Sequence, residues 1–534
     1  MTRLDFLKRA EWGLAVLLTA TALFLLVIRA THAGALWRDE CAVVNLARMP
    51  SVADITQNFQ HEAFPVPFPI FVRSYTNVFG SGDDALRWFG IAAGVALLGA
   101  LWFSSHLMGR APPLVSLALL GLNTTFLFWG TTVRGYGFGS ALIALAFSLL
   151  VSVVLNPSRT RVIAAAIISI AAVQCLVHNL ALISALIASA VIVCLVRHDL
   201  RRVIILLGIL ALCLISFVPY LNAYSSSWSQ VVEFPVTSRL LWKQFNFALG
   251  NPSPAVAWFW HIAFIILLTA SIWQLYRSRS HKPVPDWDVL LLGSLAAIIA
   301  PIAYYEFLQT LSYLTRSWYF LALISVLAVA MDCLAQVLSS AISIRIGRLI
   351  FASLALVALP INAWPKITER QTNIDIIAKK VSELATPADL IVVAPWQYGI
   401  SFNRYYHSAT PWITLPTITD LRVHRYDLFR DKMLSPHPID DVLEKIYRTL
   451  AAGNRVWLVG GIKLPPEGRA PRSLPPPPSA SVGWDNVAYS DSWIQQLGVF
   501  VREHSERGQT VTLPSSGTVS SFEDVPLVVV DGWQ

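Results

Sequence analysis

Charged residues are scarce in this chain of 534 residues, because Asp, Glu, Lys and Arg together make up only 13% of it while apolar residues make up 55%. A soluble protein of this length needs far more polar side chains to cover its surface. Length alone would suggest about three or four soluble domains. The scarcity of charge excludes an entirely soluble protein.

Cysteine is also rare, and no two cysteines form a CxxC pair. None of the five lies in the C-terminal third of the chain. Structural disulfides and thiolate metal sites are therefore not expected. The cysteines are Cys41, Cys175, Cys194, Cys213 and Cys333.

Long apolar runs dominate the first two thirds of the chain, and their length of about twenty residues is what a helix needs to cross a bilayer. The first run, Trp12 to Ile28, follows Arg3, Lys8 and Arg9 as in a signal peptide. No small-residue cleavage site follows it, so we expect it to be retained as a span. The sequence predicts a polytopic α-helical membrane protein with about eleven spans, near residues 11–29, 88–107, 113–129, 137–155, 162–178, 180–196, 203–220, 257–275, 288–305, 318–337 and 349–363.

Basic residues indicate the orientation of these spans. If the N-terminus is cytoplasmic, Lys and Arg gather in the cytoplasmic segments, which is the positive-inside bias. The net charge of +8 follows from this bias, so we expect membrane lipids and not nucleic acid as partners. The basic residues of these segments include Arg110, Arg159, Arg161, Arg197, Arg201, Arg202, Arg277, Arg279, Lys282, Arg345 and Arg348.

Three outer segments are long: residues 30–87, residues 221–256 and the region from 364 to 534. The first is amphipathic around Val43 and Ile55, which suits helices lying on the outer interface of a bacterial inner membrane. The last predicts a soluble, periplasmic α/β domain after a transmembrane domain of residues 1–363. Its expected strands are 390–393, 456–459 and 526–530, and its expected helices are 366–385, 440–452 and 491–505.

Polar residues collect at the outer ends of the spans. Ionisable groups at membrane depth are costly, and a functional site is their default explanation. Each one alone also fits a plain loop, a span terminator or a snorkelling anchor. Together they combine carboxylates, which offer a general base, with arginines, which bind phosphate bidentately. They are Arg38, Asp39, Glu40, His61, Glu62, Arg134, Tyr136, His178, Asn179, Glu306 and Arg316.

Several of these residues carry a resemblance to the GT-C superfamily of membrane glycosyltransferases, over about residues 10–340. The nearest groups are protein O-mannosyltransferases, lipid A aminoarabinose transferases and the RgtA/B/C/D-like group. The matching stretches are Trp37-Arg38-Asp39-Glu40 after the first span, His61-Glu62 before Pro65, Pro67 and Pro69, Gly82 to Arg87, Arg134-Gly135-Tyr136 and Arg316-Ser317-Trp318-Tyr319.

The resemblance implies an inverting transfer of a sugar from a polyprenyl-phosphate donor to a hydroxyl of a lipid, glycan or protein. It implies Asp39 as the general base, with Glu40 as the second choice. Substrate contacts would come from His61, Glu62, Arg134, Tyr136, Arg316 and Tyr319. A monophosphate carrier needs no metal in principle, so we expect no cofactor and no obligatory metal.

A transporter or lipid flippase is the main alternative. It would place charges near the middle of the membrane and interrupt a pair of spans. Asp332 is the main acid within an expected span, and it lies toward the inner end. A non-catalytic scaffold with a partner-binding outer domain is a third interpretation.

Overall fold

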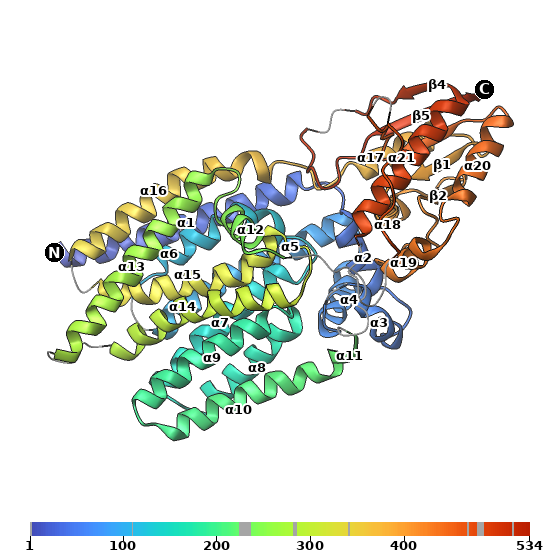
Figure 1. Ribbon diagram of the computed structural model, residues 1–534. Helices are drawn as coiled ribbons and strands as arrows, with labels where there is room; N and C mark the ends of the chain where they lie inside the picture. The colour runs from blue at the N-terminus through green and yellow to red at the C-terminus, as the bar shows by residue number, and fades with distance from the viewer. Residues whose placement is uncertain are drawn as a thin grey trace.

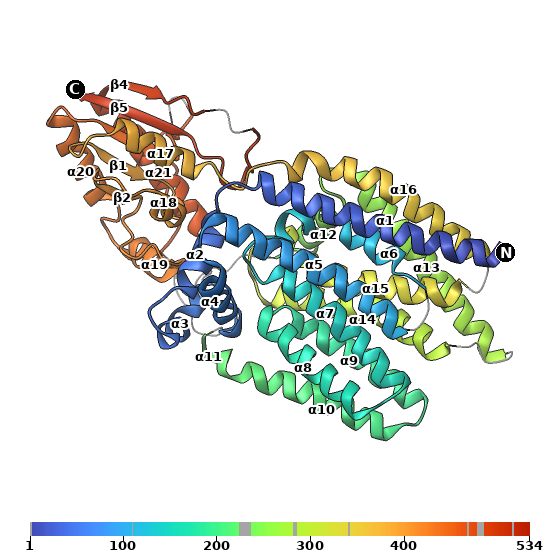
Figure 2. The ribbon, with the colours of Figure 1, turned by 180° about the vertical axis from the view of Figure 1, so that it is seen from behind.

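The computed structural model describes residues 3–62, 64–108, 111–223, 236–280, 286–339, 342–466, 469–477, 485–514 and 517–534. Arg110 and Lys282 lie outside these residues, as does part of the expected outer segment 221–256. A long bundle of helices carries a smaller α/β domain at one end, and α2, α3 and α4 lie between the two (Figures 1 and 2).

Within the described residues, nine helices are long and apolar enough to cross a membrane. They confirm nine of the eleven expected spans. A tenth, α8 (Arg159–Cys175), is a regular helix of 17 residues. The nine are α1 (Arg3–His32), α5 (Asp83–Met108), α7 (Tyr136–Leu155), α9 (Asn179–Val196), α10 (Leu200–Phe217), α13 (Pro254–Ser280), α14 (Trp287–Thr310), α15 (Leu321–Leu338) and α16 (Ile342–Ile367).

The expected span at 113–129 is wrong as a single straight helix. It consists of α6 (Leu114–Ser116) and two π-helical turns, η2 (Leu117–Gly121) and η3 (Phe126–Gly130). The break has a local cause, since the side chain of Asn123 accepts the Phe126 backbone N–H at 2.8 Å. All of this segment is buried inside the bundle, where protein partners satisfy an irregular backbone.

Asp332 of α15 caps the N-terminal end of this broken segment. Its two carboxylate oxygens accept the backbone N–H groups of Val115 and Ser116 at 3.0 and 2.9 Å. A carboxylate at a helix N-terminus is a stabilising cap. Asp332, the main acid within an expected span, therefore has a structural role.

The segment 30–87, which the sequence predicts to lie outside the membrane, forms α2 (Arg38–Ala47), α3 (Val52–Asn58), the short η1 (Phe59–His61) and α4 (Pro67–Phe79). The expected helices are present, but the apolar face of α2 packs inside the protein. Val43, Val44 and Leu46 are buried because α2 packs against α4 and against α18 (Tyr398–Tyr405) of the C-terminal domain. Its apolar face is covered by protein and not by lipid.

The C-terminal domain contains a five-stranded sheet in the order β2-β1-β3-β5-β4. The expected strands are confirmed as β1 (Leu390–Val393), β3 (Val456–Val459) and β5 (Leu527–Trp533). The sequence did not predict β2 (Trp412–Thr414), which has three residues, or β4 (Ser505–Thr510), which is polar. The remaining helices are α17 (Ile374–Leu384), α19 (Tyr426–Leu434), α20 (Asp440–Ala451) and α21 (Asn486–His504).

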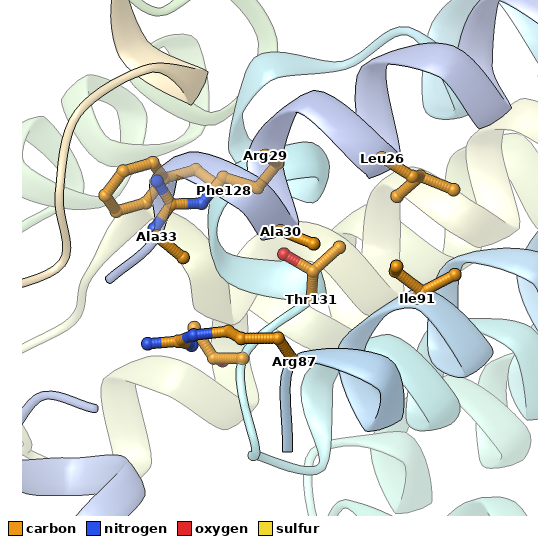
Figure 3. Close-up of a pocket in the computed structure, with 9 residues that line it drawn as sticks. Leu26, Arg29, Ala30, Ala33, Arg87, Ile91, Phe128 and Thr131 are labelled. Atoms are coloured by element: carbon orange, nitrogen blue, oxygen red, sulfur yellow. The ribbon is translucent and has the colours of Figure 1, made fainter. Parts of the chain in front are cut away.

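Polar contacts join this domain to the adjacent end of the helix bundle. Asp83, at the start of α5, accepts bonds from Arg404 and Tyr405, both at 2.8 Å. On α1, Arg29 lies against the ring of Phe128 with Arg87 nearby (Figure 3). The Arg29 guanidinium donates to three groups in the chain that leads from α16 into the domain, at Ile367, Glu369 and Gln371.

Candidate functional site

A cavity of about 800 Å³ lies where one end of the helix bundle meets the C-terminal domain. A second cavity, lined by Arg29, Arg87 and Thr131 (Figure 3), has only about 10 Å³ and cannot hold a substrate. The large cavity has walls from both parts of the chain. Its lining residues include Trp37, Arg38, Asp39, Gln60, His61, Glu62, Arg134, Tyr313, Arg316, Trp318, Tyr319, Gln397, His424, Arg425, Tyr426, Asp427, Arg430, Asn486 and Phe522.

Asp39 faces this cavity from the first turn of α2, and its side chain is 21% exposed. One carboxylate oxygen lies 3.9 Å from Nη2 of Arg134, and the other lies 3.5 Å from Nε2 of His424. Burial alone would raise the pKa of Asp39, but Arg134, His424 and Arg38 outweigh it and lower the pKa below its ordinary value. Asp39 is therefore an accessible carboxylate that stays ionised at neutral pH.

Glu40 does not line the cavity and is fully buried. Nη1 of Arg87 donates to both of its oxygens, at 3.0 and 3.2 Å, and the Val133 backbone N–H donates at 2.9 Å. Adjacent helical side chains diverge by about 100°, so only one of the two acids can face the cavity. The geometry corrects the second choice of base, because Glu40 braces α2 through Arg87.

Glu62 links the two walls of the cavity. One oxygen accepts a bond from Arg134 at 3.1 Å, and the other accepts the His424 backbone N–H at 3.0 Å and lies 2.7 Å from Nδ1 of the same histidine. Glu62, His424 and Asp39 thus form a chain of contacts. No sequence motif pointed to His424, which lies more than 350 residues beyond Glu62 in a loop of the C-terminal domain.

His61 also lines the cavity, with its Nδ1 3.9 Å from Asp427. Burial lowers the pKa of His61 below its ordinary value, although Asp427 opposes the effect. The sequence predicted that one residue of the His61-Glu62 pair would line a pocket. The structure brings both of them there.

The two arginines expected at phosphate differ in their surroundings. Arg134 lies between Glu62 and Asp39, so acids of the protein already balance its charge. Arg316 lines the cavity with its guanidinium 5.6 Å from the ring centre of Phe522, and no acid of the described residues lies within 4 Å of it. Arg316 is therefore a cation available to an anionic ligand.

The rings of the two expected tyrosines are tilted against each other with their centres 6.0 Å apart, but of the two only Tyr319 lines the cavity. Tyr136 lies behind Arg134 and packs against Phe64. The ring of His178 contacts the ring of Tyr319, with their centres 5.0 Å apart. The side-chain amide of its neighbour Asn179 donates hydrogen bonds to two backbone carbonyls. These two residues and the exposed Glu306 lie outside the cavity lining.

In the part of the chain that the structure describes, no cluster of three or more His, Cys, Asp or Glu side chains is arranged to hold a metal ion. The expectation of metal-free chemistry stays a prediction.

Neither a protein-family model nor a curated protein sequence matches this chain. Solved structures do. ArnT from Cupriavidus metallidurans bound to undecaprenyl phosphate is similar over 84% of this chain and 93% of that one, at a TM-score of 0.52 and 12% identity. The chain has the GT-C fold. The apo state of the same ArnT matches over the same shares, at a TM-score of 0.50.

A further similar structure is the Archaeoglobus fulgidus oligosaccharyltransferase tethered with an acceptor peptide. It covers 83% of this chain and 68% of its own, with 11% identity and a TM-score of 0.47. The GT-C fold confirms the predicted fold class. At 12% identity, the structural similarity establishes the fold alone. The roles of individual residues therefore rest on their geometry.

Proposed function

We propose that this protein is a glycosyltransferase that moves a sugar from a polyprenyl-phosphate donor to an acceptor hydroxyl at the outer face of the membrane. One observation carries the proposal: one cavity holds the ionised Asp39 and the guanidinium of Arg316, which has no acid of the described residues within 4 Å. Transfer from a sugar phosphate needs a base for the hydroxyl and a cation for the departing phosphate. The ArnT structure with undecaprenyl phosphate supports the same class of donor.

In the proposed reaction, Asp39 takes the proton from the acceptor hydroxyl as its oxygen bonds to the anomeric carbon. The bond from that carbon to the phosphate oxygen breaks, and the phosphate leaves with the electron pair. Arg316 stabilises the charge on the phosphate. Attack from the face opposite the leaving group inverts the anomeric centre. The low pKa of Asp39 keeps it ionised, so proton transfer accompanies bond formation.

The proposal is tested by comparing cells that make this protein with cells that make its Asp39→Asn variant. Mass spectrometry of envelope lipids, glycans and proteins should show one class of molecule that lacks a sugar in the variant. Polyprenyl-phosphate sugar should accumulate in the same cells. Envelope molecules unchanged in all three classes, together with altered distribution of the intact carrier across the membrane, would favour the flippase interpretation instead.

Replacing Arg316 by Lys should weaken donor binding. A lysine keeps the positive charge but loses the planar fork that binds phosphate oxygens bidentately. Hydrogen bonds to charged groups contribute about 1.5–3 kcal/mol, so we expect roughly tenfold weaker binding for Arg316→Lys and up to roughly a hundredfold for Arg316→Ala. Binding of a polyprenyl-phosphate analogue to purified protein gives the affinity.

The matched control is Arg422→Lys, because Arg422 pairs with Asp420 on the exposed surface and lies outside the cavity lining. It should bind the analogue like the wild type. Equal affinities for Arg316→Ala and Arg422→Lys would assign Arg316 to the membrane interface and not to the donor.

We further propose that the N-terminus is cytoplasmic in a bacterial inner membrane and that the domain beginning near residue 364 is periplasmic. All five native cysteines are buried, so an engineered cysteine is labelled against a low background. Ala452→Cys, exposed directly after α20, should react with a membrane-impermeant maleimide in intact spheroplasts. Thr160→Cys, exposed in the first turn of α8 on the cytoplasmic side of this topology, should react only after lysis. The reverse pattern would invert the topology and move the site to the cytoplasm.

A further inference from the structure

One short loop of the C-terminal domain, residues 520–524, reaches the membrane-domain side of the cavity. Two adjacent residues of this loop contact the two groups to which the proposed reaction assigns chemistry. Phe522 packs beside Arg316, and Glu523 binds the helix that carries Asp39. The two contacts are independent, because one is aromatic and the other is a hydrogen bond.

Glu523 caps α2 from the other domain. Helix α2 begins after Trp37, whose side chain has no oxygen to accept a bond from the exposed N–H groups of the first turn. One carboxylate oxygen of Glu523 accepts the Arg38 backbone N–H at 3.0 Å. The other accepts the hydroxyls of Ser401 and Thr372 at 2.6 and 3.0 Å, and the side chain is fully buried. The carboxylate is held rigidly at the helix N-terminus.

Asp39 therefore lies between two anchored neighbours. The backbone N–H of Arg38 is bound by Glu523, and the side chain of Glu40 is bound by Arg87. Together these contacts fix both the axis and the rotation of the first turn of α2. A displacement of a reacting group by about 1 Å can cost on the order of a hundredfold in rate, so this anchoring bears directly on proton transfer.

Phe522 supports the other side of the site. Its ring packs edge-on against Trp129 at 5.1 Å and Trp318 at 5.2 Å, and it also contacts Trp37 at 6.3 Å. Arg316 lies 5.6 Å from the same ring, within the range of a cation–π contact. This contact holds the guanidinium beside the cavity wall without neutralising its charge.

We propose that Phe522 and Glu523 are positioning residues for the transfer reaction: Phe522 orients the guanidinium at the donor phosphate, and Glu523 fixes the helix that presents the base. The C-terminal domain then forms part of the active site. This inference rests on the proposed function for its catalytic meaning, while the cap itself is testable without activity.

Replacing Glu523 by Ala should lower kcat roughly ten- to a hundredfold while the donor KM changes little, because the cap acts on the base and not on the phosphate. Phe522→Leu should give the opposite split, a raised donor KM with a smaller change in kcat. Asp524→Asn is the matched control, since this neighbouring acid is exposed and lies outside the cavity lining. It should behave as the wild type in both parameters.

Glu523→Gln adds a pH readout. Burial raises the pKa of Glu523 to about 7, against the opposing influence of Arg38, Ser401 and Thr372. Cys41 of α2 and Tyr398 of α18 are the other titratable groups that face it. The charged cap forms as pH rises through about 7, so wild-type kcat should rise there and the Gln variant should lack that rise. For stability the sign is reversed: because the folded-state pKa is raised, the free energy of unfolding of the wild type should fall as pH rises from 4.5 to about 7.

The closing experiment measures backbone hydrogen exchange by mass spectrometry in the full-length protein, alongside kcat. Glu523→Ala should speed exchange in a peptide covering residues 36–47, Glu523→Gln should restore most of the protection, and Asp524→Asn should leave it unchanged. The proposal would be overturned if Glu523→Ala had the same exchange rates and the same kcat as the wild type. It would also be overturned by faster exchange throughout the C-terminal domain, because that result means unfolding. A wild-type protein that transfers no sugar, with exchange changed only in α2, would overturn the proposed function and leave the cap in place.

Discussion

Asp39→Asn should reduce sugar transfer by roughly 100- to 10,000-fold, which is the usual contribution of general acid–base catalysis. The amide keeps the shape of the side chain but cannot accept the proton of the acceptor hydroxyl. Donor binding should persist, because Arg316 binds the phosphate in our proposal and lies outside the set of side chains that contact Asp39. Purified variants in a transfer assay with a polyprenyl-phosphate sugar give the turnover, and analogue binding is measured in parallel.

The control for this prediction is Asp84→Asn, which removes an exposed carboxylate from the same outer segment of the chain. Its turnover should equal that of the wild type. Near-normal turnover in Asp39→Asn would remove Asp39 as the base. Loss of both turnover and donor binding would instead mean that Asp39 acts by holding Arg134 in place.

Glu40→Gln should act mainly on stability. The change leaves the buried guanidinium of Arg87 without its carboxylate, and breaking a buried ion pair costs about 3–5 kcal/mol. The thermal midpoint of the detergent-purified protein should therefore fall by several degrees, whereas Asp39→Asn should leave it nearly unchanged. Glu444→Gln is the matched control, because it breaks an exposed pair with Arg448 and such pairs contribute about 0–1 kcal/mol.

We thus expect opposite effects at two adjacent positions: loss of turnover in Asp39→Asn and loss of stability in Glu40→Gln. A thermal midpoint of Glu40→Gln equal to that of Glu444→Gln would remove the bracing role. Turnover abolished in Glu40→Gln at unchanged stability would return the catalytic role to Glu40 and contradict the burial that the structure gives it.

Most of the membrane-spanning architecture was predictable from sequence, because the signal for a span is a local run of apolar residues. The exception at 113–129 has the same apolar composition as a true span. What interrupts its helix is Asn123, whose side chain bonds the backbone of Phe126 and the carbonyl of Ala248. A hydropathy profile does not detect such a hydrogen bond.

The candidate site was predictable only in part. Asp39, Arg134 and Arg316 stand in short motifs at the ends of spans, and a polar residue in such a place is visible in sequence. His424 and Phe522 lie in irregular loops of the C-terminal domain without a motif. Their role depends on contacts with residues several hundred positions away.

The sequence by itself determined that this chain crosses a membrane many times, that an α/β domain follows the last span, and that acids and arginines gather at one face. These are properties of composition and short-range pattern, which require no knowledge of long-range contacts. Only the tertiary structure decided which acid of the Asp39-Glu40 pair faces the cavity, because the position of Arg87 determines which side chain is held away from it. The tertiary structure also decided that Glu523, 485 residues beyond Arg38, caps the helix of Asp39, because packing between domains is not encoded in any local pattern.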